Sequence, residues 1–149
     1  VFHLENNSRT YPNRAYFLGG VDSLRGFLQD QVLPQDQVDL IDSERAQGRT
    51  LSPAAIVRTG DFFYLGRAEL RFPLFGSLQG GIFCDLGNVW AFGDTVRFEA
   101  LFRLRVSVGA GLRITTPVGP IALDYGFNLT RREDLAEPFG AFHFSIGLF

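Results

Sequence analysis

Two acids, Glu69 and Asp85, are the residues best placed for chemistry, because a predicted hairpin brings them together. Residues 75–77 (Phe-Gly-Ser) form a tight turn between the segments 61–74 and 78–90, and pairing about this turn sets the two acids opposite each other on the polar face. Neighbouring carboxylates repel, and one is driven to protonate unless a cation lies between them. An arginine fits that place because its planar fork can engage both acids while staying charged. The alternative is that water solvates both.

A second charged pair is expected across the next turn. Residues 117–120 (Pro-Val-Gly-Pro) have the composition of a turn. Pairing about Val118-Gly119 sets Arg113 opposite Asp124, again on the polar face. We interpret this as a structural ion pair that fixes the strand register, rather than as a catalytic pair.

No catalytic or metal-binding pattern accompanies these charges. His3 and His143 fit no metal-ligand spacing, and we expect His143 to be solvated on the polar face of the last strand. Cys84 has no cationic neighbour in the sequence that would activate a thiol, so we interpret it as a packing residue. Gly109-Ala-Gly111 is no dinucleotide-binding motif, because no helix follows it. We therefore expect no enzyme, no metal and no cofactor.

Composition narrows the class of protein further. The chain has 149 residues with a net charge of −2, and no basic stripe that would indicate nucleic-acid binding. It contains no run of about 18 apolar residues, which a transmembrane helix would need. It also lacks methionine, so we expect a piece of a longer protein, and its single cysteine excludes an internal disulfide.

The elements that must position the charged residues are strands. From residue 61 onward, apolar residues alternate with glycines, charged residues or other polar residues, which is the pattern of strands with one apolar and one polar face. Short and long connections alternate between strands of about 9 to 13 residues, a length that suits spans tilted through a bilayer. The five predicted strands are 61–74, 78–90, 102–116, 121–129 and 141–149.

Alternation alone does not decide whether the apolar face meets lipid or a protein core. A soluble sandwich has the same period with its apolar face inward. Glycines and paired charges on the polar face suit the lumen of a transmembrane β-barrel, and aromatic residues near the strand ends suit an interfacial girdle. We therefore favour the barrel and keep the sandwich as the alternative. The girdle aromatics are Tyr64, Phe75, Trp90, Phe92 and Phe139.

The chain before the strands divides into two predicted parts. Residues 1–18 are expected to form the end of a strand and a polar loop, and residues 19–60 a long loop that opens with Gly19-Gly20. Between residues 29 and 59 this loop is rich in Gln, Asp and Ser. Its length indicates a functional or partly disordered loop.

Several ordered motifs resemble the C-terminal barrel of the BamA/TamA family of outer-membrane assembly proteins, also called bacterial surface antigens. The resemblance runs from about residue 11 to residue 149 and is weakest over 28–60, which looks like an insertion. It rests on residues 17–27 (FLGGVDSLRGF), 68–74 (AELRFPL), 83–90 (FCDLGNVW) and 109–126 (GAGLRITTPVGPIALDYG).

The resemblance implies a site inside the barrel. In that family the Arg-Gly-aromatic loop folds into the lumen and its arginine meets acids on the inner wall. Carried over, Arg25 is this arginine, and Glu69 and Asp85 are its partners, which agrees with the need for a cation between the two acids. Gly26 would allow close approach of the loop backbone, and Phe27 would wedge against the wall. Simple turn chemistry is the alternative for the glycines.

The last strand resembles the terminal signal of outer-membrane barrels. In the family this strand pairs weakly with the first strand, and the seam between them opens to template an incoming strand, whose backbone groups pair with the open edge. Gly147 would weaken pairing there. The signal and seam residues are Phe142, Phe144, Ile146, Gly147 and Phe149.

The resemblance implies a bacterial outer-membrane protein, with an organelle outer membrane as the less favoured location. Implied partners are the lipid bilayer, unfolded outer-membrane client proteins, the remaining strands of a barrel of roughly sixteen strands, upstream POTRA domains and accessory assembly subunits. The implied function is non-enzymatic assembly or insertion of outer-membrane proteins. Two alternatives are a two-partner-secretion pore that transports a polypeptide, and a barrel that anchors a surface enzyme.

Overall fold

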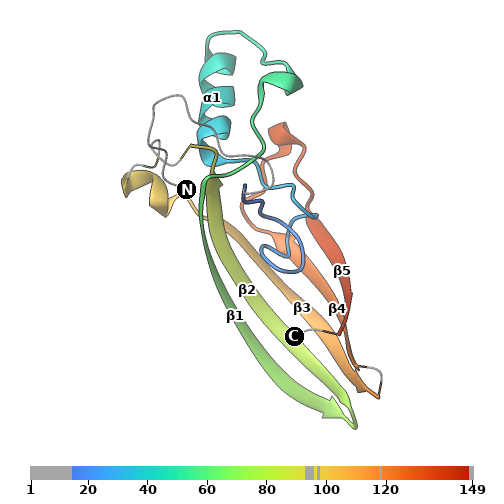
Figure 1. Ribbon diagram of the computed structural model, residues 1–149. Coiled ribbons are helices and arrows are strands. Elements are labelled where there is room, and N and C mark those ends of the chain that lie inside the picture. The colour runs from blue at the N-terminus through green and yellow to red at the C-terminus, as the bar shows by residue number, and fades with distance from the viewer. Residues whose placement is uncertain (1–14, 93–95, 97, 118, 148–149) are drawn as a thin grey trace. The chain divides into compact units, whose positions relative to one another are not determined.

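The computed structural model describes residues 15–92, 96, 98–117 and 119–147, and five antiparallel strands form one sheet in the order β1-β2-β3-β4-β5 (Figure 1). Strands that are adjacent in the sheet are consecutive along the chain, as in an up-and-down barrel. The strands are β1 (Phe62–Phe75), β2 (Leu78–Trp90), β3 (Arg105–Thr116), β4 (Gly119–Asn128) and β5 (Gly140–Ile146). The predicted all-β architecture is therefore confirmed.

The register between β3 and β4 differs from the prediction. Thr116 pairs with Gly119, so the turn is centred one residue earlier than we expected, and Asp124 lies opposite Gly111 instead of Arg113. The predicted pairing is therefore wrong by two residues. Because side chains alternate with a period of two, an error of two residues keeps Arg113 and Asp124 on the same face.

Burial on the two faces of the sheet is the reverse of that in a water-soluble protein. Lumen-side polar residues are buried: Asp85 and Ser107 are 0% exposed and Asp124 is 3% exposed. The alternate apolar residues are the exposed ones. A soluble sandwich requires the opposite arrangement, so this burial favours lipid contact. Exposed apolar residues of the strands include Leu70, Ile82, Leu112, Leu123, Phe142 and Phe144.

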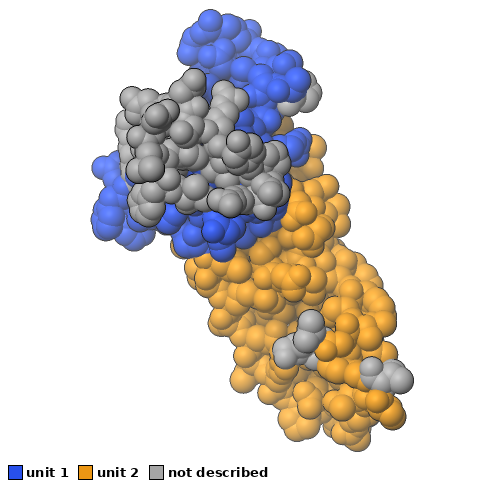
Figure 2. Space-filling model, in the orientation of Figure 1, with its two compact units in different colours: residues 1–18, 32–64, 88–103 blue, residues 19–31, 65–87, 104–149 orange. Residues whose placement is uncertain are grey.

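The chain forms two compact units (Figure 2). One unit consists of residues 1–18, 32–64 and 88–103, and the other of residues 19–31, 65–87 and 104–149. The second unit contains most of the sheet together with the segment 19–31, which lies against it in Figure 1. This segment, called the docked loop below, is the part of the chain that carries Arg25.

The first unit contains a helix, α1 (Gln35–Ala46), within the segment for which we expected a loop. The helix is held by polar contacts: both carboxylate oxygens of Asp36 accept backbone N–H groups, from Ala91 at 2.9 Å and from Phe92 at 3.0 Å. Gln35 accepts a hydrogen bond of 3.0 Å from Asn88. Because α1 has almost no apolar face, its sequence shows no helical hydrophobic period. None of the helices described is both long and apolar enough to cross a membrane.

One predicted girdle aromatic lies in a different environment. Trp90 is only 1% exposed and packs against the rings of Phe62 and Tyr64, with centroid distances of 5.7 and 5.6 Å. Trp90, at the end of β2, is therefore part of a buried aromatic cluster and not of an exposed girdle. Phe75 and Phe139 are exposed, as a girdle requires.

Candidate functional site

The docked loop is a tightly turned segment that points Arg25 at the sheet. Gly19 and Gly20 have φ angles of 110° and 104°, a region that favours glycine. The N–H of Gly20 donates to the carbonyl oxygens of Leu24 and Phe27 at 3.2 Å, and that of Gly19 donates to the Ser23 hydroxyl at 2.8 Å. Phe27, predicted to wedge against the wall, is fully buried.

Arg25 is 1% exposed and binds both predicted acids. Its Nε and Nη2 donate to the two carboxylate oxygens of Asp85 at 2.8 and 2.7 Å, and its Nη1 donates to Glu69 at 2.7 Å. The backbone N–H of Arg25 also donates to Asp85, at 3.2 Å. The contact with Asp85 is bidentate and uses the planar fork of donors that only arginine offers.

Two further residues contact the Arg25 guanidinium, and sequence reasoning gave neither of them this role. The ring of Phe83 lies under the guanidinium, with 3.5 Å from Cζ to the ring centroid, which is a cation–π contact. Asp124 lies 3.5 Å from Nη1. Phe83 falls on the polar face by alternation, and an aromatic residue there is the signal that could have revealed it.

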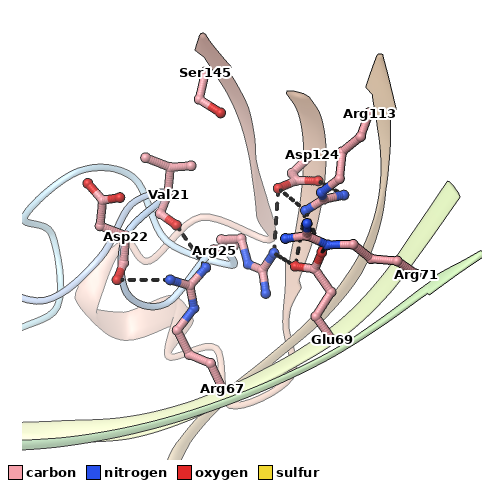
Figure 3. Close-up of a pocket in the computed structure, with 9 residues that line it drawn as sticks. All are labelled: Val21, Asp22, Arg25, Arg67, Glu69, Arg71, Arg113, Asp124 and Ser145. Atoms are coloured by element: carbon pink, nitrogen blue, oxygen red, sulfur yellow. Dashed lines mark hydrogen bonds and ion pairs between the residues drawn. The ribbon is translucent and has the colours of Figure 1, made fainter. Parts of the chain in front are cut away.

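The acids and arginines form one continuous cluster (Figure 3). Arg113 donates to Glu69 at 3.0 Å and to Asp124 at 3.2 Å, so the predicted Arg113–Asp124 pair exists, although the two residues do not lie directly opposite each other. Burial alone would lower the pKa of Arg25, but hydrogen bonds and charges from Asp85 and Glu69 outweigh it and hold this pKa above its ordinary value. Arg25 therefore stays charged.

Glycines allow the loop backbone to lie directly on the strands. A Cβ on Gly26 would lie 2.5 Å from the Cβ of Ser107, and a Cβ on Gly126 of β4 would overlap the carbonyl group of Arg25. Any larger residue at either position would push the loop off the sheet. The close approach predicted for Gly26 is present, and Gly126 supplies the matching space on the wall.

A cavity of about 460 Å³ opens beside the cluster. Arg67 and Arg71 of β1 line it, and Arg67 donates to the carbonyl oxygens of Val21 and Asp22 at 3.1 and 3.3 Å. Ser145 of β5 also lines the cavity (Figure 3). Arg25 is held between the acids Asp85 and Glu69, so the arrangement is suited to holding the docked loop on the wall.

A second buried ion pair, which sequence reasoning missed, holds the connection between β4 and β5. Arg105 lies 2.8 Å from Glu137, and both residues are at most 6% exposed. Glu137 also accepts the backbone N–H of Arg132 at 2.7 Å. Arg105 lies in the predicted strand 102–116 and Glu137 in the polar connection that follows β4, and no pattern along the chain relates the two positions.

The residues of the predicted terminal signal lie as the alternation requires. Phe142, Phe144 and Ile146 are each about three-fifths exposed on the apolar face. Gly147 follows β5 with a φ of 102°, and Phe149 lies outside the described residues. His143 is not simply solvated as expected, because its Nε2 lies 3.0 Å from the carbonyl oxygen of Arg25.

Comparison with known proteins identifies the family. The model of the Omp85 superfamily domain matches residues 3–149, which is nearly the whole chain. The chain belongs to the Omp85 superfamily. The resemblance to BamA/TamA-type barrels is thereby confirmed, and so is the assignment of this Omp85 chain to an outer-membrane β-barrel fold.

Curated relatives of this Omp85 chain come from bacteria and from plants. It is 31% identical to outer envelope protein 80, chloroplastic, of Arabidopsis thaliana over 92% of its length, and 27% identical to the Oryza sativa subsp. japonica protein of that name over 97%. It is 26% identical over 98% of its length to the outer membrane protein assembly factor BamA of Nitratidesulfovibrio vulgaris. The chain spans only 15–17% of the length of these relatives.

Proposed function

We propose that this chain is the C-terminal part of a barrel that inserts or translocates proteins at an outer membrane, without enzymatic chemistry. The observation that carries the proposal is the docked loop, whose arginine is bound to acids of three strands in a chain of the Omp85 superfamily. A similar protein whose name is outer membrane protein assembly factor supports this proposal.

In the proposed mechanism, the terminal strand offers backbone groups to an incoming client strand at the seam. Unpaired N–H and C=O groups inside lipid are costly, so an incoming strand that satisfies them is held in place. The docked loop, tethered through Arg25, Gly26 and Phe27 to Glu69 and Asp85, keeps the inner wall in one arrangement while this exchange occurs. The phenylalanines of β5 and Gly147 belong to the strand that exchanges partners.

The proposed partners are the lipid bilayer, unfolded client proteins, the other strands of the same barrel, upstream POTRA domains and accessory subunits. For the location, we propose the bacterial outer membrane, as expected from the sequence. The plant relatives make a chloroplast outer envelope the competing location, and the source of the complete gene decides between the two.

The test uses the complete protein reconstituted in liposomes with an unfolded β-barrel client. Wild type should insert the client, measured by protease protection and by altered gel mobility of the folded barrel, well above empty liposomes. Arg25→Ala should lower the insertion rate at least several-fold, because Asp85 and Glu69 lose the cation between them. Its own barrel should still insert, while the docked loop becomes sensitive to protease.

Arg49→Ala is the matched control, because the Arg49 side chain is 63% exposed and its ion pair with Glu44 lies outside the cluster. It should behave as wild type. Wild-type liposomes no better than empty ones would refute the insertase function and leave transport or anchoring. An Arg25→Ala protein with full activity and a protected loop would refute the tether.

A further inference from the structure

We infer that His143 is a positioning residue that couples the docked loop to the terminal strand β5. The inference rests on the proposed function, in which β5 exchanges partners. It starts from one contact: the His143 Nε2 lies 3.0 Å from the carbonyl oxygen of Arg25. Because a carbonyl oxygen only accepts hydrogen bonds, Nε2 carries the proton and donates it.

This contact completes the attachment of a single loop residue to the sheet. The side chain of Arg25 binds Glu69 on β1 and Asp85 on β2 and lies near Asp124 on β4, and its carbonyl oxygen binds His143 on β5. Among hydrogen bonds between residues that the structure describes, the His143 bond alone joins the docked loop to β5. Among the described residues, this side chain is therefore the direct hydrogen-bonded link between the docked loop and β5.

The position of His143 makes the coupling direct. His143 pairs with Asp124 across β4 and β5, so the two side chains lie on the same lumen-side face. Asp124 contacts the guanidinium of Arg25 and His143 its backbone, so the same residue is held from both strands. Moving β5 away from β4 must either break the His143 bond or pull the loop with it.

Gly126 explains why the bond is short enough to form. It lies on β4 next to Tyr125 and pairs with Ala141 of β5, two residues before His143. The missing side chain lets the Arg25 carbonyl group rest on the strand backbone. The loop carbonyl oxygen is thereby brought within reach of a ring on the neighbouring strand.

The test measures hydrogen exchange of the complete protein in lipid nanodiscs. His143→Phe keeps a ring but removes the donor, and should speed exchange of the Arg25 and Phe27 amides and of the β5 amides about fivefold, the factor for one ordinary hydrogen bond. His143→Gln keeps a donor at similar reach and should restore slow exchange. Ser145→Ala, a change on the same face of β5 whose side chain has no hydrogen bond among the described residues, should match wild type.

A double-mutant cycle separates coupling from two independent losses. Coupling between two sites is reciprocal, so Arg25→Ala should speed exchange in β5 of the otherwise wild-type protein. In the His143→Phe background, the same change should add nothing to β5. If His143→Phe does not fold, the effect of Arg25→Ala on exchange in β5 still tests whether the docked loop and β5 are coupled.

Three results would overturn the inference: wild-type exchange in His143→Phe, a His143→Gln protein as fast as His143→Phe, or additive effects in the cycle. Exchange is read without any client. A failed coupling with normal client insertion therefore refutes the role of His143 alone, whereas failed insertion by wild type refutes the proposed function.

Discussion

At the scale of single residues, Asp85 is the centre of the site. It is fully buried and accepts three hydrogen bonds from Arg25, and Arg67 lies 3.6 Å away. A buried carboxylate without a cation is costly, so the wall presents a place that only a bidentate cation fills well. The specificity of the tether for arginine follows from this geometry.

Arg113 offers a test of the cluster that leaves the docked loop in place. Arg113→Ala removes the cation shared by Glu69 and Asp124 and should destabilise the folded barrel by roughly 1–3 kcal/mol. This cost is smaller than that of breaking an ion pair shielded from water, because a cavity adjoins the cluster. The measurement is the temperature at which the folded protein loses its altered mobility on gels. Arg49→Ala should leave that temperature unchanged. Equal temperatures for Arg113→Ala and wild type would mean that the pair contributes nothing.

At the scale of elements, the sequence predicted the strands well because their alternation is nearly unbroken. It predicted the joining of Glu69 and Asp85 by Arg25 only with help from the family resemblance, since nothing in the local pattern near residue 25 specifies where the loop docks. The β3–β4 register was missed by two residues, because a turn containing two prolines and a glycine can be centred at more than one position. Helix α1 was missed because polar contacts between distant residues hold it.

The connection between β4 and β5 depends on a contact that a mutation can isolate. Glu137→Gln keeps the shape of the side chain but leaves Arg105 buried without its charge partner. The connection 129–139 should become cleavable by added protease at least several times faster, and β5 should lose part of its support. Glu133→Gln is the matched control in the same connection, because Glu133 is 79% exposed. Equal cleavage of the two variants would show that the buried pair does not hold this connection.

At the scale of the whole molecule, the distribution of polarity is that of a protein whose solvent on one side is lipid. Asp85, Asp124 and Arg113 are buried on the lumen-side face, and large apolar residues are exposed on the other. A contiguous exposed apolar surface of this kind promotes aggregation in water, but it makes favourable contact with lipid in a bilayer. Open edges are not tolerated in lipid, so both edges of this sheet need partner strands there.

Lipid contact can be measured on two residues of one strand. Phe144 of β5 is 58% exposed on the apolar face, whereas its neighbour Ser145 lines the cavity on the other face. In a protein that carries Cys84→Ala, a fluorophore attached to Phe144→Cys should be quenched strongly by brominated lipids in vesicles of the complete protein, and one attached to Ser145→Cys weakly. The reverse order, or equal quenching, would contradict the assignment of the faces.

The order of residues along the chain determines when the docked loop can attach to the sheet. Arg25 and its neighbours precede every residue that holds them: Glu69, Asp85, Asp124 and finally His143. During synthesis and folding, this early segment is made before its partners, and its attachment is complete only when β5 has formed. A docked loop therefore reports that β5 is in place, and a barrel in which β5 is missing or mispaired would leave the loop undocked and open to proteolysis.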